Sequence, residues 1–256
     1  MQFLIGAAAG AIVGLALGVV GGGGSILAVP LIVYAVGVND PHLAVGTSAL
    51  AVSANAVAGL VSHARAGTVR WRIAGLFAAA GAVGAWMGSL AGKALAGPKL
   101  LACFAALMLV VGVLMLRDRR TRGDALAEPG QVSTPKLLGV GALTGTVSGF
   151  FGIGGGFLIV PGLMYAAHLT ILEAVGSALV AVAAFGLTTA VNYARSGWID
   201  WPLAAVFVGG GILGGVAGAH LAQRLSARRR ALHRLYASAV FLAALYMIYR
   251  SVRGGP

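Results

Sequence analysis

The sequence is poor in charged residues, and acids are the scarcest of them. Only 9% of the 256 residues are charged, and Asp and Glu together number six. An average soluble domain carries about 25% charged residues, so this chain cannot cover a globular surface with polar groups. The hydrophobic fraction of 59% and the mean hydropathy of +0.94 instead indicate a chain whose main solvent is lipid.

Cysteine is almost absent as well. The single cysteine, Cys103, excludes an internal disulfide framework and a cysteine-based metal cluster. The sequence also lacks other metal-ligand spacings, a phosphate-binding loop, a dinucleotide fingerprint and a nucleophile with a base partner. We therefore expect that the protein is no enzyme and that it binds no cofactor and no metal.

Basic residues outnumber acids, and the formal net charge of +12 raises the question of nucleic acid as a partner. The arginines and lysines lie in short gaps between apolar runs, and they form no patch interleaved with aromatic residues. Basic residues in such gaps flank membrane spans and set their orientation. The sequence therefore predicts a lipid bilayer as the surroundings and no nucleic-acid partner.

Long apolar stretches recur along the chain, and each is long enough to cross a hydrocarbon core of about 30 Å as a helix. The stretches are continuous rather than alternating, which favours helices over a closed barrel. We expect an all-α, polytopic transmembrane helical bundle of about eight helices. They are predicted at residues 3–37, 42–63, 73–95, 100–116, 137–168, 172–193, 202–222 and 235–249.

The chain contains two similar halves. The stretch GVVGGGGSILAVP at residues 18–30 resembles GFFGIGGGFLIVP at 149–161, and HARAGTVRW at 63–71 corresponds to YARSGWIDW at 193–201. We predict two homologous four-helix units, residues 1–116 and 137–256, joined by a polar linker at 117–136. Spaced glycines also correspond between the units: Gly10, Gly14 and Gly18 with Gly141, Gly145 and Gly149, and Gly81, Gly84 and Gly88 with Gly211, Gly214 and Gly218.

The first apolar segment of each unit is too long for one straight span, and a glycine cluster interrupts it. Glycine is a poor helix former, so each cluster predicts a broken or re-entrant helix. A break that reverses the chain makes the units inverted and a simple break leaves them parallel; the basic residues do not decide between the two. Where the helix restarts, near Ile26 and Phe157, its first amides can hold an anion. Close helix packing is the alternative role of these glycines.

The candidate binding residues form two groups. The pair His63 and Arg65, with Arg195 at the equivalent place, lies at the end of the second segment of each unit. Arginine can hold an oxyanion and histidine titrates near neutral pH, although we favour interfacial anchoring for the arginines. The other group comprises cluster glycines and nearby polar groups, whose hydroxyls also suit interhelical hydrogen bonds: Gly23, Gly24, Ser25, Thr47, Asn55, Gly154, Gly155, Gly156 and Ser177.

These motifs resemble those of the TauE/SafE family of sulfite and organosulfur-anion exporters. The resemblance rests on the stretch from Gly152 to Pro161 and its copy ending at Pro30, followed by AVGTS at 44–48 and AVGSA at 174–178. It covers nearly the whole chain. It implies a multi-pass permease of a bacterial inner or plasma membrane that exports sulfite, sulfoacetate or related anions without a cofactor. The first half departs from the pattern, because Gly22 and Ser25 replace Ile153 and Gly156.

We therefore expect a secondary transporter that binds a small sulfur-containing anion between the two glycine-broken helices and works by alternating access. The lack of acids at the centre of the spans agrees with an anionic substrate. An anion channel or a carrier for another small organic acid fits the same site, and a membrane-embedded enzyme or scaffold subunit is a third reading. The substrate, the coupling ion, the orientation and the formation of a homo-oligomer are left open.

Overall fold

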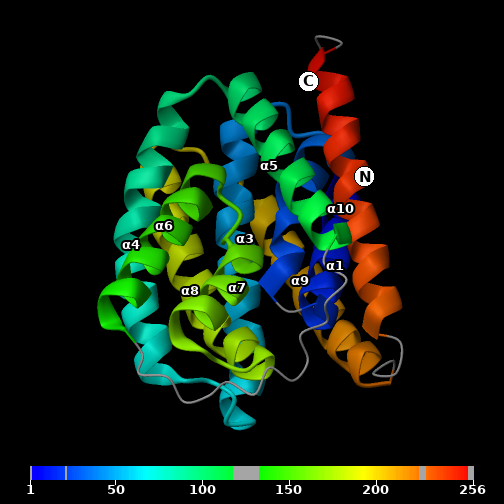
Figure 1. Ribbon diagram of the computed structural model, residues 1–256. Helices are drawn as coiled ribbons and strands as arrows, with labels where there is room; N and C mark the ends of the chain where they lie inside the picture. The colour runs from blue at the N-terminus through cyan, green and yellow to red at the C-terminus, as the bar shows by residue number, and fades with distance from the viewer. Residues whose placement is uncertain (1, 21, 118–132, 225–228, 253–256) are drawn as a thin grey trace.

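The computed structural model of the protein describes residues 2–20, 22–117, 133–224 and 229–252. All regular structure in these ranges is helical (Figure 1). Ten α-helices are present where about eight were expected, because the first segment of each half is split in two. The predicted all-α bundle is therefore confirmed. The predicted linker lies mostly outside the described residues, so its boundaries stay a prediction.

Each half consists of a split first segment and three long helices. The first half comprises α1 (Gln2–Val20), the 3-10 helix η1 (Gly22–Leu27), α2 (Ala28–Pro30), the π-helical turn η2 (Leu31–Ala35), α3 (Pro41–Arg65), α4 (Trp71–Ala94) and α5 (Gly97–Arg117). The second half comprises α6 (Thr134–Phe151), α7 (Gly156–Ala167), α8 (Ile171–Ala194), α9 (Trp201–Arg224) and α10 (Arg229–Val252). By length and composition, α3, α4, α8 and residues Trp201–Gly218 of α9 can each cross a membrane.

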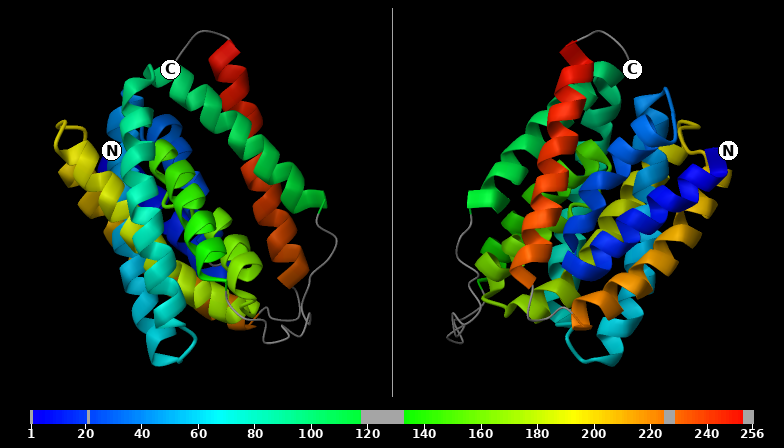
Figure 2. Two further views of the ribbon diagram at one scale, coloured as in Figure 1. Left: turned by 60° about the vertical axis from the view of Figure 1, so that its left-hand side comes forward. Right: turned by 90° about the vertical axis from the view of Figure 1, so that its right-hand side faces the viewer.

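The split segments are helical hairpins. In hairpin 1, made of α1 and the run from η1 to η2, Gly24 packs against the backbone of α1 at Leu17. In hairpin 2, made of α6 and α7, Gly155 packs against Ser148. The chain leaves each hairpin at the end of the bundle where it entered, and the two hairpins open toward opposite ends (Figure 1 and Figure 2).

The predicted glycine ridges join the two halves. α1 runs parallel to α9, and α6 runs parallel to α4. A Cβ atom added at Gly10 would overlap the backbone of Phe207, and one added at Gly145 would overlap the backbone of Gly81. Small residues allow helix backbones to approach this closely in a membrane. Each hairpin is therefore held mainly by a long helix of the opposite half.

The equivalent helices α3 and α8 cross antiparallel at the centre of the bundle. Gly46 near the start of α3 lies against Tyr193 near the end of α8, and Gly186 lies against Ala49 and Ser53. Ser53 Oγ donates a hydrogen bond of 2.8 Å to the carbonyl oxygen of Ala183, which is its own counterpart in the second half. Equivalent helices run in opposite directions and the hairpins open toward opposite ends. Of the two alternatives, inverted and parallel units, the structure therefore has the inverted one.

The inverted arrangement also gathers most of the basic residues at one end of the bundle. We call the end where α3, α5 and α9 finish and α4, α6 and α10 begin the basic end. It carries nine basic residues at or beside described helix ends, whereas the opposite end carries four. By the positive-inside rule we expect the basic end to face the cytoplasm. The nine are Arg65, Arg70, Arg72, Arg117, Lys136, Arg224, Arg229, Arg230 and Arg234, and the four are Lys93, Lys99, Arg195 and Arg250.

Cysteine accessibility tests this topology. Ala66 and Ser196 occupy equivalent exposed positions in the two halves. In a Cys103→Ser background, we expect a membrane-impermeant maleimide to label Ala66→Cys only from the cytoplasmic side and Ser196→Cys only from the outer side. Labelling of both positions from the same side of oriented vesicles would contradict the inverted arrangement.

A matched glycine pair on α6 tests the contact between the halves. Gly145 abuts the backbone of α4, whereas Gly139 has open space within the described structure. Gly145→Ala should lower the free energy of unfolding by about 1–3 kcal/mol because of overpacking. Gly139→Ala should leave the free energy of unfolding unchanged or raise it by about 0.5–1 kcal/mol. Thermal unfolding in detergent measures both variants, and equal melting temperatures would show that the ridge tolerates a side chain.

Candidate functional site

The tips of the two hairpins lie beside the crossing of α3 and α8. A Cβ atom on Gly154, in the tip of hairpin 2, would be 2.8 Å from Val52 Cγ1 and 3.0 Å from Val182 Cγ1. Val52 and Val182 are equivalent residues of the two halves. From the other hairpin, η1 packs against α7 and α8. The two glycine clusters therefore approach the same central region from opposite ends of the bundle (Figure 2).

Hairpin 2 reverses through three glycines in the left-handed region. Gly152, Gly154 and Gly155 have φ values of 67°, 66° and 67°, a conformation that other L-residues adopt only at a cost. α7 begins at Gly156, one residue before the predicted restart at Phe157. Its N-cap is Gly155, which has no side chain to cap the helix. The first two amides of α7, those of Gly156 and Phe157, precede the bonds from Leu158 and Ile159 to the Gly155 carbonyl, so they lack an intrahelical acceptor and a side-chain cap and carry partial positive charge.

Ser148 places a hydroxyl group at this helix start. The residue is 0% exposed, and its Oγ atom lies 3.0 Å from the position of a Cβ added to the N-cap residue Gly155. Among the described residues, Ser148 Oγ has no hydrogen-bond partner. A buried polar group costs free energy unless it is hydrogen-bonded. An unpaired donor beside an uncapped helix start is thus suited to bind an anion.

Ser48 of α3 contacts the same glycine turn. Its Oγ lies 2.9 Å from the carbonyl oxygen of Val45 and 3.2 Å from that of Gly152, and it can donate to either. The second contact fixes the position of the glycine turn relative to α3. Ser48 therefore supports the tip, whereas Ser148 is the hydroxyl group still available to a ligand.

Hairpin 1 does not reproduce this geometry. Gly22–Leu27, which includes Gly23, forms the 3-10 helix η1 and continues directly into α2 and η2. After the break the helix resumes near Ile26 as predicted, first as the 3-10 helix η1 and from Ala28 as α2, so it lacks the long α-helix that follows hairpin 2's turn. Gly24 and Ser25 are both buried in this tip. The uncapped start of a longer helix is found at hairpin 2.

Asn55 is a second buried polar group whose side chain is unpaired within the described structure. It lies one turn beyond Val52 on α3, is 8% exposed and packs on Gly211 of α9. Neither Nδ2 nor Oδ1 has a hydrogen-bond partner there. In the second half the equivalent residue is Phe185, whose ring packs on Gly81 in the same way. An amide in the place of a hydrocarbon ring indicates a position for water or a polar ligand.

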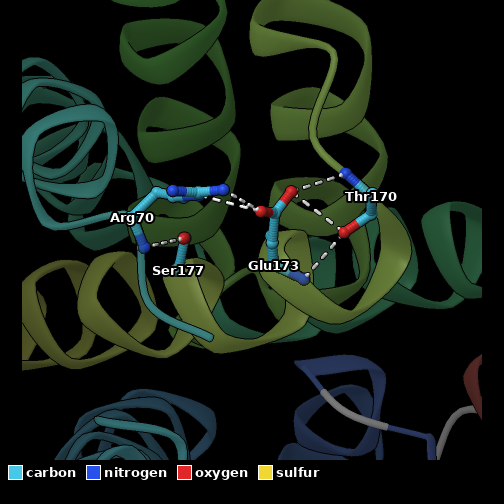
Figure 3. A network of polar contacts seen from close by, with 4 residues as sticks. All are labelled: Arg70, Thr170, Glu173 and Ser177. Carbon is cyan, nitrogen blue, oxygen red and sulfur yellow. Dashed lines mark hydrogen bonds and ion pairs between the residues drawn. The ribbon is translucent and has the colours of Figure 1, made fainter. Parts of the chain in front are cut away.

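Thr47 and Ser177 bind loops rather than the tips. Thr47 Oγ1 accepts a hydrogen bond of 3.0 Å from the backbone N–H of Asp200, and Ser177 Oγ accepts one of 3.0 Å from that of Arg70. Figure 3 shows the second contact beside Glu173, which receives a 2.8 Å hydrogen bond from Arg70 Nε and forms a capping box with Thr170. The two hydroxyls thus attach the loops before α4 and α9 to the opposite half.

His63, Arg65 and Arg195 lie at helix ends, away from the tips. His63 Nδ1 is 3.0 Å from Thr68 Oγ1. Arg65 is exposed more than three turns along α3 from Val52. The guanidinium of Arg195 lies 5.1 Å from the ring centroid of Trp86. The structure therefore groups the glycines of hairpin 2 with Ser148, and it leaves these three side chains elsewhere.

Ser148 was not identified from the sequence. It lies in a predicted helix four residues before the glycine turn, and hydroxyl residues are common in membrane helices. A usable signal was present nonetheless, because the equivalent residue of the first half is Leu17. A polar residue whose equivalent in the other repeat is apolar indicates a position with a role in one half only.

Two of the hollows at the surface of the described structure do not contact Ser148. One of about 510 Å³ at the basic end is lined by Arg70, Arg72, Trp71 and Thr134, among others. The other, of about 440 Å³, is mainly apolar and lies between hairpin 1 and α10. Ser148 and the whole turn from Gly152 to Gly156 are buried. In this conformation the tip of hairpin 2 is closed to solvent.

The apolar helical bundle with hairpins buried at its centre defines a multi-pass membrane protein. The chain belongs to the family described as Sulfite exporter TauE/SafE, whose pattern it matches over residues 6–247. The protein is accordingly a membrane transporter and not an enzyme.

Relatives of the chain carry transporter names. A "Probable membrane transporter protein" of Xylella fastidiosa (strain 9a5c) is 51% identical over 243 residues, which cover 94% of this chain and 93% of that protein. The "Probable membrane transporter protein YunE" of Bacillus subtilis (strain 168) is 25% identical over 249 residues, covering 89% and 91%. No solved structure was found to match the chain.

The glycine turn of hairpin 2 can be tested with a matched control. Gly155 and Gly67 have nearly equal φ values, 67° and 68°, but only Gly155 faces a close neighbour, Ser148, at 2.7 Å from an added Cβ. Replacement by alanine costs about 1–2 kcal/mol in backbone strain at either position. We expect Gly155→Ala to lower the rate of sulfite release from proteoliposomes at least about tenfold, whereas Gly67→Ala should retain transport. Equal rates in the two variants would show that the turn is only a packing contact.

Proposed function

We propose that the protein exports a small sulfur-containing anion, such as sulfite, sulfoacetate or a related organosulfonate, by alternating access. The observation that carries the proposal is the buried Ser148 hydroxyl, without a partner among the described residues, beside the uncapped start of α7. Membership of the sulfite exporter family supports an oxyanion as the ligand of these donors. The proposed site comprises Ser148 with Gly154, Gly155 and Gly156.

The donors of this site suit an oxyanion. A serine hydroxyl donates one hydrogen bond, and the amides at a helix start add donors and a favourable dipole. The acids at described positions lie at helix ends, where Asp40 and Thr170 with Glu173 cap α3 and α8. No described carboxylate therefore faces the tip of hairpin 2 and repels an anion. Neutral fixed donors bind a desolvated anion without a counter-charge that would have to be released again.

The inverted halves supply a route to alternating access. Transporters with inverted repeats bind their substrate near the membrane midplane, between discontinuous helices. Here the two hairpins enter from opposite ends and converge on the crossing of α3 and α8 (Figure 2). Because each hairpin rests on a helix of the other half, an exchange of conformations between the halves opens the site to one end and closes it to the other.

An anion channel or a carrier for another small organic acid is the second candidate. Hydroxyl and amide donors recognise any compact oxyanion, so this donor set alone does not select sulfur. The buried state of Ser148 and of the glycine turn favours a carrier over an open pore. Single-channel currents across a planar bilayer would reverse that preference.

Efflux from proteoliposomes tests the proposal. Vesicles that contain the purified protein and are loaded with radiolabelled sulfite should release it faster than protein-free vesicles do. Sulfoacetate, thiosulfate and sulfate, loaded in parallel, define the selectivity. Release that equals that of protein-free vesicles for all four anions would refute anion export.

Ser148→Ala separates binding from folding. The substitution removes an unpaired buried hydroxyl, so the melting temperature should stay equal or rise, whereas sulfite release should fall about three- to tenfold. Ser53→Ala is the matched control, because Ser53 Oγ has a partner in Ala183 and its loss should destabilise the protein by about 0.5–1.5 kcal/mol. Normal transport by Ser148→Ala would remove this residue from the site.

A further inference from the structure

A second polar cluster lies between the tip of hairpin 2 and the end of the bundle opposite the basic end. It comprises Lys93 of α4, Tyr193 and Asn192 of α8, His42 of α3 and Trp198 of the loop before α9. We propose that Lys93, Tyr193 and His42 form a second anion-binding site, at which the oxyanion pauses on its way between the hairpin tip and the outer face. The inference deepens the proposed function and rests on it for the direction of passage.

Lys93 supplies a half-buried positive charge. Its Nζ donates to the backbone oxygen and to Oδ1 of Asn192, at 3.2 and 3.1 Å, and lies 5.8 Å from the ring centroid of Trp198. In the described part of the chain, no carboxylate lies within ion-pair distance of Lys93, and the salt bridge found there joins Arg70 and Glu173. An ammonium group carries three donors, so one remains available. A partly desolvated cation without a counter-ion attracts an anion.

Two further polar atoms of the cluster are unpaired among the described residues. Tyr193 is 0% exposed, yet its Oη has no hydrogen-bond partner, and the same holds for the buried Nδ1 atom of His42. The His42 ring stacks on Trp198 at 4.6 Å between centroids, and Tyr193 lies 5.9 Å from the same ring. The imidazole, the phenol and the ammonium group therefore all lie around the same indole ring.

The cluster is continuous with the tip of hairpin 2. Gly92, the neighbour of Lys93, packs against the carbonyl of Phe150, and a Cβ added to Gly92 would be 3.3 Å from Tyr193 Oη. On α3, His42 lies six residues, or about 9 Å of helix, before Ser48. Ser48 is the serine whose hydroxyl can donate to the carbonyl oxygen of Gly152. An anion released from the tip toward this end meets the cluster next.

The cluster has no counterpart at the basic end. Lys93 corresponds to Gln223, His42 to Leu172 and Tyr193 to His63, so the ammonium and phenol groups are replaced. His63 Nδ1 already has a neighbour in Thr68 Oγ1 at 3.0 Å. Of the positive charges at that end, that of Arg70 is paired with Glu173 (Figure 3). A site on one side only, on the outer side by the positive-inside rule, suits a net direction of passage.

Tryptophan fluorescence can report binding at this cluster without any transport. With Trp71, Trp86 and Trp201 replaced by phenylalanine, the emission comes from Trp198, which touches the cluster. Sulfite added to the purified protein should change this emission saturably. Lys93→Gln should weaken the apparent affinity about tenfold or more, and Tyr193→Phe, which removes only an unpaired hydroxyl, about three- to tenfold.

A matched control separates this site from other sources of signal. Lys136→Gln removes a lysine that lies 3.7 Å from the ring centroid of Tyr165 at the basic end, and it should keep the affinity of the parent protein. An unchanged affinity in both Lys93→Gln and Tyr193→Phe, or no saturable signal in the parent, would overturn the inference. Saturable binding in a protein that releases no sulfur anion from proteoliposomes would preserve this site and refute export.

Discussion

Direct backbone contact between glycines of opposite halves is the constraint on which the rest of the structure depends. α1 rests on α9 and α6 rests on α4, so neither hairpin is held mainly by its own half. Lipid tails are as apolar as leucine, and close packing therefore replaces the hydrophobic effect as the force between membrane helices. The hairpins stay in position only because the ridges allow this approach, and the approach brings both tips to the crossing of α3 and α8.

Glycine serves a different purpose at the tips than along the ridges. In the ridges it keeps helical geometry and removes a side chain, as Gly145 does against Gly81. In hairpin 2, Gly152, Gly154 and Gly155 adopt positive φ and reverse the chain within the bundle. A reversal at membrane depth is tolerated where the backbone is buried in protein. The same residue type thus fixes the hairpin to the other half and leaves the start of α7 uncapped beside Ser148.

Much of this architecture was predictable from the sequence, because spacing reveals ridges and clusters. The matched glycines, the split first segments and the restart near Phe157 all follow from pattern. The sequence pattern does not show whether a glycine cluster reverses the chain, since the reversal depends on φ values that glycine permits but does not require. For the same reason the sequence did not show that the restart near Ile26 is 3-10 in hairpin 1 but α-helical near Phe157 in hairpin 2. Thr47 and Ser177 looked like a symmetric binding pair, yet their symmetry is that of two loop contacts.

The departures from symmetry are as informative as the symmetry itself. An inverted frame supplies two equivalent conformations, but a frame with two identical tips would hold two anions that repel each other across a low-dielectric centre. Here the position equivalent to Ser148 in the first half is Leu17, and the position equivalent to Lys93 in the second half is Gln223. The hydrogen-bond donors therefore gather around hairpin 2. Asn55, whose equivalent in the second half is Phe185, places its amide beside hairpin 1, where it adds a polar group without charge. In the proposed mechanism, one attractive tip in a symmetric frame accommodates a single anion while both access states remain available to the protein.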